Sequence, residues 1–142
     1  MFSCYSMIMF NIAKTKPEVR KIAEKYRLPL VLLFGSQVSG RTHPQSDVDI
    51  AFLSEKRMSL IEIAKMQIVF SQKLKLKNLE LVDLKTAAPL LLKQAAEKSV
   101  LLYEKEPFLF ANFKIYALKC FMEAKKLFDL RKSSLDKFLQ NV

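Results

Sequence analysis

The residues of this chain that could do chemistry are concentrated between Leu33 and Phe52. An apolar run ends at Gly35 and Ser36, and ten residues separate Ser36 from the pair Asp47 and Asp49, which lies in a second apolar run. Alternate residues of a strand point to the same face, so the two carboxylates would stand side by side. Mg²⁺ commonly binds through one or two carboxylates together with substrate phosphates. Backbone N–H groups at a Gly-Ser turn could hold those phosphates, so the segment predicts a metal-nucleotide site.

A third acidic residue would come from the later segment 78–84, which has the pattern of a strand and carries Glu80 and Asp83. These two residues are an odd number of positions apart, so a regular strand would turn them to opposite faces. The spacing alone leaves open which of them joins Asp47 and Asp49. An unpaired charge inside the apolar sequence VDIAF would be costly, which favours a bound metal over a purely structural carboxylate pair.

Helices and strands alternate along the part of the chain that would position these acids. Strands are predicted over 30–34, 48–53, 78–84 and 100–103, and helices over 17–27, over 58–73 and from Thr86. Pro17 is placed in the first turn of its helix, where proline is tolerated. The pattern predicts an α+β fold with a small mixed sheet of three to four strands flanked by helices.

Two helices are predicted to turn apolar faces to the core. In the helix over 17–27 this face consists of Val19, Ile22, Ala23 and Tyr26. In the helix over 58–73 it consists of Ile61, Ala64, Ile68 and Phe70.

The last third of the chain predicts a long helix with a partner-binding face. From Phe110 onward the apolar residues follow a three-four spacing that suits packing against another helix: Phe113, Ala117, Cys120, Ala124 and Leu127. A single helix over 107–128 would be about 30 Å long, which is long for a domain of this size. Ser133 and Ser134 are expected to begin a separate short helix. Part of the apolar face is therefore predicted to meet a partner, either another copy of the chain or a different protein.

The composition describes one basic domain. The chain has 142 residues, of which 51% are hydrophobic and only two are glycine, so we expect one folded unit. Its net charge of +10 lies mainly in the flanks, with six basic against two acidic residues over 1–27 and eight against four over 105–142. Such flanks could attract nucleotides, nucleic acid or an acidic protein, or could be solvated lysines.

The cysteines and the amino terminus add limits on location. Cys4 and Cys120 are far apart and the chain has one histidine, which argues against a zinc site, does not indicate a disulfide framework, and fits a cytoplasmic protein. Residues 1–15 are predicted to be an apolar extension that is too short to cross a membrane. Met7 and Met9 are alternative starts.

The joint pattern resembles the nucleotidyltransferases related to DNA polymerase beta. It consists of Gly-Ser, ten residues, Asp-x-Asp and a later acid, with Gly40, Ser46 and the stretch LELVDLKTAAPLLLKQAAEKSVLLYE as further matches. The resemblance implies a nucleotidyltransferase fold and two Mg²⁺ ions, with ATP as substrate. Asp47 and Asp49 would bridge the metals, and Gly35 and Ser36 would hold the β and γ phosphates. Glu80 falls at the position of the third acid, where the family usually has aspartate.

Small members of this group with a helical tail resemble antitoxins that are encoded beside HEPN-domain ribonuclease toxins. This resemblance implies transfer of AMP from ATP to a tyrosine hydroxyl of a cognate HEPN toxin. It also implies a minimal nucleotidyltransferase domain over 16–106 and a helical tail over 107–142 that packs on the domain or on the partner. Two alternatives are a non-catalytic antitoxin that neutralises the toxin by binding, and nucleotidyl transfer to a small molecule.

Overall fold

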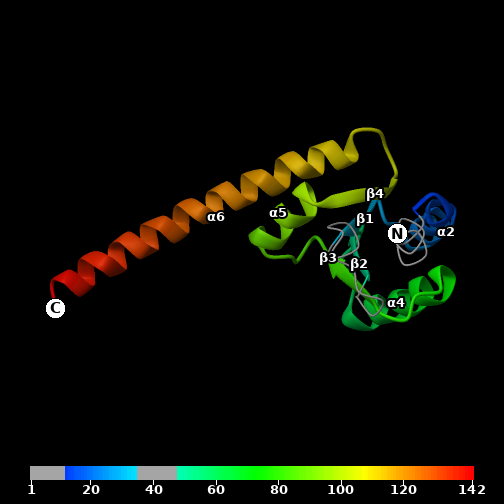
Figure 1. The fold of residues 1–142 in the computed structure, drawn as a ribbon, viewed down its shortest axis with the longest axis horizontal. Helices are drawn as coiled ribbons and strands as arrows, with labels where there is room; N and C mark the ends of the chain where they lie inside the picture. The colour runs from blue at the N-terminus through cyan, green and yellow to red at the C-terminus, as the bar shows by residue number, and fades with distance from the viewer. Residues whose placement is uncertain (1–11, 35–47) are drawn as a thin grey trace, which may run out of the picture.

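The computed structural model describes residues 12–34 and 48–142, which form an α+β fold (Figure 1). Helices cover both faces of a single four-stranded sheet. The elements are, in chain order, α2 (Ile12–Tyr26), β1 (Leu30–Phe34), β2 (Val48–Leu53), α4 (Leu60–Leu74), β3 (Leu79–Asp83), α5 (Pro89–Glu97), β4 (Ser99–Glu104) and α6 (Leu109–Gln140).

The sheet is mixed, as predicted, with strand order β3-β2-β1-β4. β1 lies in the middle and pairs antiparallel with both β2 and β4, whereas β2 and β3 are parallel. Parallel neighbours need a crossover connection, and α4 supplies it. All five residues of β1 are buried, which explains why this strand is an uninterrupted apolar run.

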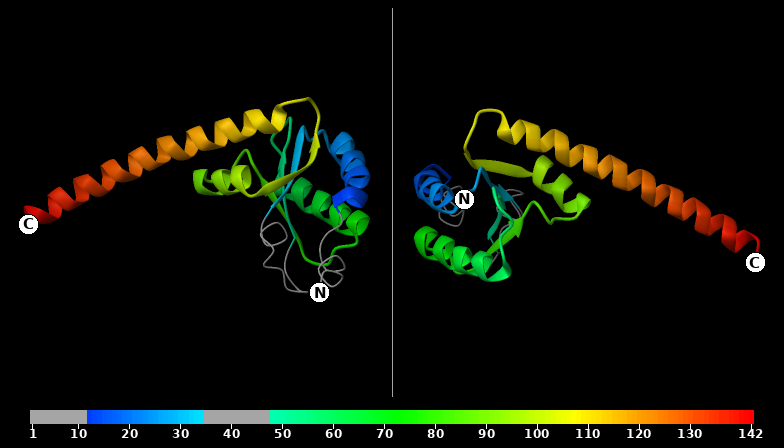
Figure 2. Two further views of the ribbon diagram at one scale, coloured as in Figure 1. Left: turned by 45° about the horizontal axis from the view of Figure 1, so that its top comes forward. Right: turned by 180° about the vertical axis from the view of Figure 1, so that it is seen from behind.

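The core consists of two layers, one on each face of the sheet (Figure 2). On one face, α2 and α4 pack against alternate residues of the strands. Val19, Ile22 and Ala23 of α2 are buried there, as the sequence predicted, and Tyr26 packs against them. On the other face, α5 and the first turns of α6 cover the remaining strand residues.

Pro17 lies inside α2 rather than in its first turn, because the helix already begins at Ile12. The prediction for this helix was therefore wrong at its amino end. Thr15 is buried on the same side as Val19 and Ile22. Packing of this earlier turn against the domain offsets the backbone hydrogen bond that proline cannot make.

The buried face of α4 differs from the predicted one. Ile61 and Ile68 are 69% and 57% exposed and Ala64 is exposed as well, whereas Met66 and Phe70 are fully buried. Only Phe70 was correctly predicted. The helix starts at a capping box, in which the Ser59 side chain accepts a hydrogen bond from the Glu62 N–H and the Ser59 N–H donates to the Glu62 carboxylate.

The last helix is longer than expected. α6 continues without interruption through Ser133 and Ser134, so the predicted separate short helix was wrong. Serine lowers helix stability only modestly, and an exposed serine pair does not stop a helix. The 32 residues span about 48 Å. Phe113 and Ala117 are buried on the side that faces α5, and every residue after Ala124 is exposed. The carboxyl half of α6 extends away from the other elements (Figure 1).

The helix that follows β3 also starts later than predicted, at Pro89 rather than Thr86. Proline suits the first helical position because its missing N–H would have no partner there. Thr86 instead belongs to the turn after β3, where its backbone N–H and its hydroxyl donate to the Asp83 carbonyl. Within the described ranges, none of the helices combines the length and apolar character of a membrane span.

Candidate functional site

Asp49 of β2 and Glu80 of β3 are direct partners in the parallel register of these two strands. Register partners point to the same face, and neighbouring strands lie about 4.8 Å apart. The two carboxylates therefore stand next to each other at one end of the sheet. Asp49 is half-buried and Glu80 is exposed, so the pair borders on solvent.

Asp83, the other acid of β3, is occupied by the turn that follows its strand. Its Oδ1 accepts a hydrogen bond of 3.0 Å from the Lys85 N–H, and its register partner is Phe52 rather than an acid. Asp83 thus caps a turn. Glu80 is the acidic residue of β3 that lies beside Asp49, on the same face.

Two hydrogen bonds hold the strand ends that carry this pair. The Val48 N–H donates to the Asn78 carbonyl at 2.8 Å and so joins the starts of β2 and β3. Gln67 of α4 donates from Nε2 to the Leu79 carbonyl, also at 2.8 Å, directly before Glu80. Sequence inspection missed Gln67, because a single glutamine on a helix gives no signal of its partner 12 residues away.

Phe34 flanks Asp49 on the side away from Glu80, and Ser99 of β4 is the register partner of Phe34. The four residues form a row across the sheet on the face that α5 and α6 cover. The Ser99 hydroxyl is buried and has no hydrogen-bond partner in the described part of the chain. The row therefore has an apolar side chain, Phe34, next to the carboxylates and a buried hydroxyl on the strand beyond it.

Gly35, Ser36 and Asp47 lie outside the described residues. Phe34 and Val48, which border segment 35–47 in the sequence, both lie at the end of the sheet that carries Asp49. Within 12–34 and 48–142 no three acidic, histidine or cysteine side chains gather into a metal-ligand cluster, since only two of the three predicted carboxylates belong to these ranges. Two adjacent carboxylates are hard oxygen donors, and they fit Mg²⁺ better than a softer metal.

The segment that contains the carboxylate pair matches a known protein family. Residues 17–108 match the model of the family described as Polymerase beta, Nucleotidyltransferase, and this match covers more than half of the chain. The chain belongs to this family. The match contains both Asp49 and Glu80, all four strands, and the helices α4 and α5.

Solved structures share the nucleotidyltransferase fold. One is a crystal structure of a toxin-antitoxin with AMP-PNP, with TM-score 0.68 and 24% identity over 87% of this chain and 98% of the other. Another contains a tri-AMPylated HEPN toxin from Shewanella oneidensis in complex with an MNT antitoxin, with TM-score 0.64 and 22% identity over 90% and 98% of the two chains. A comparison with curated proteins finds no match. These likenesses, all below 25% identity, establish the fold that the sequence predicted.

Proposed function

We propose that this nucleotidyltransferase is an antitoxin that transfers AMP from ATP to a tyrosine hydroxyl of a cognate HEPN toxin. The register pairing of Asp49 with Glu80, inside a domain of the Polymerase beta family, is the observation that carries this proposal. Two structural neighbours support ATP as the substrate and a HEPN toxin as the acceptor, since one was solved with AMP-PNP and another with an AMPylated HEPN toxin.

In this proposal Asp47, Asp49 and Glu80 would hold the Mg²⁺ ions, with Glu80 toward the acceptor. Gly35 and Ser36 hold the β and γ phosphates of ATP. The bound metal would neutralise charge on the triphosphate and lower the pKa of the attacking hydroxyl. A bond forms between the tyrosine oxygen and the α-phosphorus, the bond to pyrophosphate breaks, and the phenolic proton leaves to solvent. The protein residues orient the two substrates.

The test is incubation of the protein with labelled ATP, Mg²⁺ and the product of the neighbouring gene. Asp49→Asn and Glu80→Gln should each lower label transfer at least about 100-fold, because each removes a negative oxygen from the metal-binding set. Asp83→Asn is the matched control, since its amide oxygen can still accept from Lys85 and it lies on the other face. Label transfer that survives Asp49→Asn, or falls equally in Asp83→Asn, would contradict the assignment.

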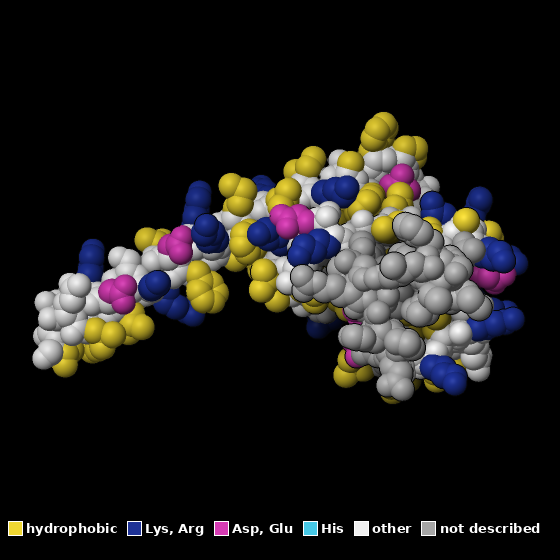
Figure 3. All heavy atoms as spheres, viewed as in Figure 1, with side chains coloured by type: hydrophobic (Ala, Val, Ile, Leu, Met, Phe, Trp, Pro, Cys, Tyr) yellow, Lys and Arg dark blue, Asp and Glu magenta, His cyan; other side chains and the backbone are white. Residues whose placement is uncertain are grey.

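A second candidate function is neutralisation of the toxin by binding, and α6 favours it. The apolar stripe that packs on α5 through Phe113 and Ala117 continues beyond the domain as Leu127, Phe128, Leu135 and Phe138. Leu127 and Phe128 are 69% and 73% exposed, and hydrophobic side chains gather along this helix (Figure 3). An exposed apolar stripe of this extent is typical of a protein interface. We propose that 107–142 forms the toxin-binding tail of a catalytic domain over 16–106, with 1–15 as an extension.

Variants of the stripe separate binding from catalysis. Leu127→Asp combined with Phe128→Asp should weaken toxin binding at least about 100-fold, because two central apolar contacts would be replaced by buried charges. Leu60→Asp, at an 85% exposed position on α4, is the matched control and should leave binding unchanged. Binding is measured by calorimetry with the purified toxin. Unaltered affinity of the double variant would exclude α6 as the contact.

A further inference from the structure

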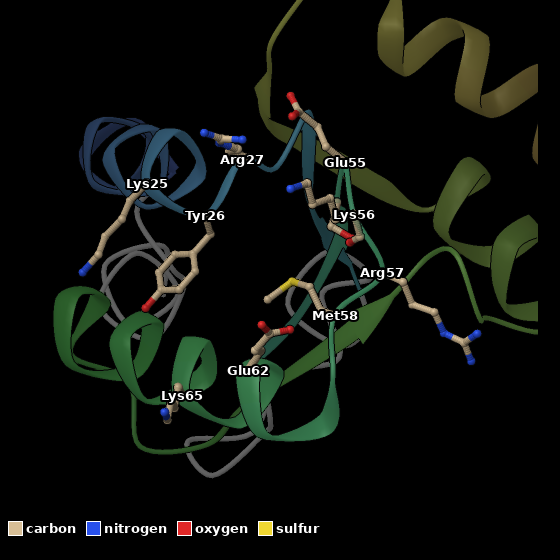
Figure 4. A pocket seen from close by; sticks show the side chains of 10 residues that line it. Lys25, Tyr26, Arg27, Glu55, Lys56, Arg57, Met58, Glu62 and Lys65 are labelled. Carbon is tan, nitrogen blue, oxygen red and sulfur yellow. The ribbon is translucent and has the colours of Figure 1, made fainter.

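A second concave site lies at the far end of the sheet from the carboxylate pair. It is a cavity of about 360 Å³ between the carboxyl end of α2, the loop after β2 and the first turns of α4 (Figure 4). Asp49 is near the start of β2, whereas Ser54, which lines the cavity, follows the end of that strand. Five residues of strand separate them by about 16 Å. The volume is within the usual range of small-ligand sites.

The border of this cavity is strongly basic. Five cationic residues line it: Lys25, Arg27, Lys56, Arg57 and Lys65. None of them forms an ion pair with a carboxylate of the described chain. Arg57 is turned away from the hollow, and Lys25 lies on the outer side of Tyr26 with its ammonium 5.5 Å from the centre of that ring, which leaves Arg27, Lys56 and Lys65 around the hollow (Figure 4). Cations in excess over carboxylates repel one another, and an anion between them relieves that repulsion.

The two carboxylates at the border are already engaged. Glu55 forms an ion pair with Lys105 at 2.9 Å. Glu62 accepts the hydrogen bond of the Ser59 N–H in the capping box at 2.8 Å. Both keep their negative charge, and the Glu55 carboxylate also attracts Arg27 and Lys56, so the border has five cations against two carboxylates. Tyr26 and Met58 line the hollow and give it an apolar surface, and the end of the Met58 side chain points toward the side on which Tyr26 lies (Figure 4).

We infer that this cavity binds a small ligand that carries a run of phosphate groups, separately from the nucleotide that is transferred. Cations arranged around a hollow suit a compact anion, whereas an extended nucleic acid or a flat acidic protein surface would need a stripe or a plane of charge. The ligand could be inorganic polyphosphate or the phosphate chain of a nucleotide. In the second case the apolar surface of Tyr26 and Met58 would contact the nucleoside. The inference does not depend on the proposed toxin or on the carboxylate pair.

The backbone offers a variant that removes one cation without disturbing the fold. Arg27 ends α2 with φ 56°, in the left-handed region that glycine adopts freely. Arg27→Gly therefore deletes the guanidinium and leaves the turn intact. Lys75 ends α4 with φ 54°, at the opposite end of that helix from the cavity. Lys75→Gly is its matched control, since it removes one positive charge from an equivalent backbone position.

The experiment is calorimetric titration of the full chain with inorganic tripolyphosphate, ADP and ATP, in EDTA and at about 0.05 M salt, where exposed charges are weakly screened. Arg27→Gly and Lys56→Glu should each weaken tripolyphosphate binding about tenfold, and Lys75→Gly less than about twofold. Glu62→Gln should strengthen binding, because its amide oxygen keeps the cap while a repelling charge disappears. Asp49→Asn should leave the affinity for tripolyphosphate unchanged. Tighter binding of ATP than of tripolyphosphate would identify the nucleotide as ligand, and equal binding would identify the phosphate chain.

Three results would overturn the inference. Absence of tripolyphosphate binding to the parent protein is the first. Stronger binding in Asp49→Asn would assign the anion to the carboxylate end of the sheet, because in EDTA no metal joins Asp49 to phosphate and the lost carboxylate would have repelled the anion. Equal weakening by Arg27→Gly and Lys75→Gly would show attraction to the net charge of +10 rather than to a site.

Discussion

At the scale of single residues, Asp49 and Glu80 lie side by side because of the register between β2 and β3, and not because they are close in the sequence. Asp49 and Glu80 are separated by all of α4, and a shift of β3 by one residue would turn Glu80 to the opposite face. The Gln67 amide and the Val48 N–H hold the start of β3 against such a shift. Residues outside the acidic set thus decide where the third carboxylate stands.

Gln67→Leu should lower the free energy of unfolding by about 1–3 kcal/mol. The reason is that the carbonyl of Leu79, a buried residue, would lose the hydrogen bond from the Gln67 side chain. Urea denaturation followed by circular dichroism measures this change. Gln72→Leu, at an exposed position of the same helix, should leave the unfolding midpoint almost unaltered. Equal stability of the two variants would contradict a role for Gln67 in holding β3.

At the scale of elements, α4 shows why a predicted helix can have the wrong buried face. Its sequence LIEIAKMQIVF contains apolar residues on nearly every side, so several faces satisfy a helical period equally well. Contact with α2 and the sheet selects the face with Met66 and Phe70. The face of α2, in contrast, was predicted correctly, because its apolar residues are few and regularly spaced.

Alanine substitutions test the observed face of α4. Phe70→Ala should cost about 3–5 kcal/mol of stability, because a fully buried ring leaves a cavity. Ile68→Ala should change stability by less than about 0.5 kcal/mol, because more than half of Ile68 is already exposed to solvent. Chemical denaturation of the two variants provides the comparison. A larger loss at Ile68 than at Phe70 would restore the face that the sequence predicted.

At the scale of the whole molecule, an ion pair joins two segments 50 residues apart in the sequence. Lys105, after β4, donates to Glu55, after β2, across the end of the central strand β1. The hydrogen bond from Lys105 lowers the pKa of the Glu55 carboxyl, and the same bond raises the pKa of Lys105. Both groups are exposed to solvent, so their contribution to stability is small.

The pH dependence of this pair has a definite sign. Because the pKa of Glu55 is lower in the folded protein than in the unfolded chain, the ionised carboxylate stabilises the fold at pH values above the unfolded pKa. This stabilisation is lost as the pH falls through the folded pKa. Because the pKa of Lys105 is higher in the folded protein than in the unfolded chain, the protonated amine stabilises the fold at pH values below the unfolded pKa. This stabilisation is lost as the pH rises through the folded pKa. The stability difference between the parent and Glu55→Gln should therefore be largest between about pH 5 and pH 10 and should vanish in stronger acid. Thermal unfolding over this range measures it, and a difference that grows in acid would contradict the pairing.

Sequence alone determined the features that neighbouring residues encode: the alternation of strands and helices, the mixed sheet, the acidic residues and the resemblance to the polymerase beta family. It also predicted an apolar tail. Each of these depends on local periodicity, turn residues or spacing within one segment. The positions of Gly35, Ser36 and Asp47 remain predictions, since they lie outside the described residues.

Only the tertiary structure decided which face of α4 is buried and that α6 continues for 32 residues. The spacing of Glu80 and Asp83 left the third acid open, the family resemblance favoured Glu80, and the strand register places Glu80 beside Asp49. The tertiary structure also brought together the basic cavity from α2, α4 and the loop after β2. The physical reason is the same in each case. Register, packing and charge clustering depend on contacts between segments far apart in the chain, and local sequence patterns are compatible with more than one such arrangement.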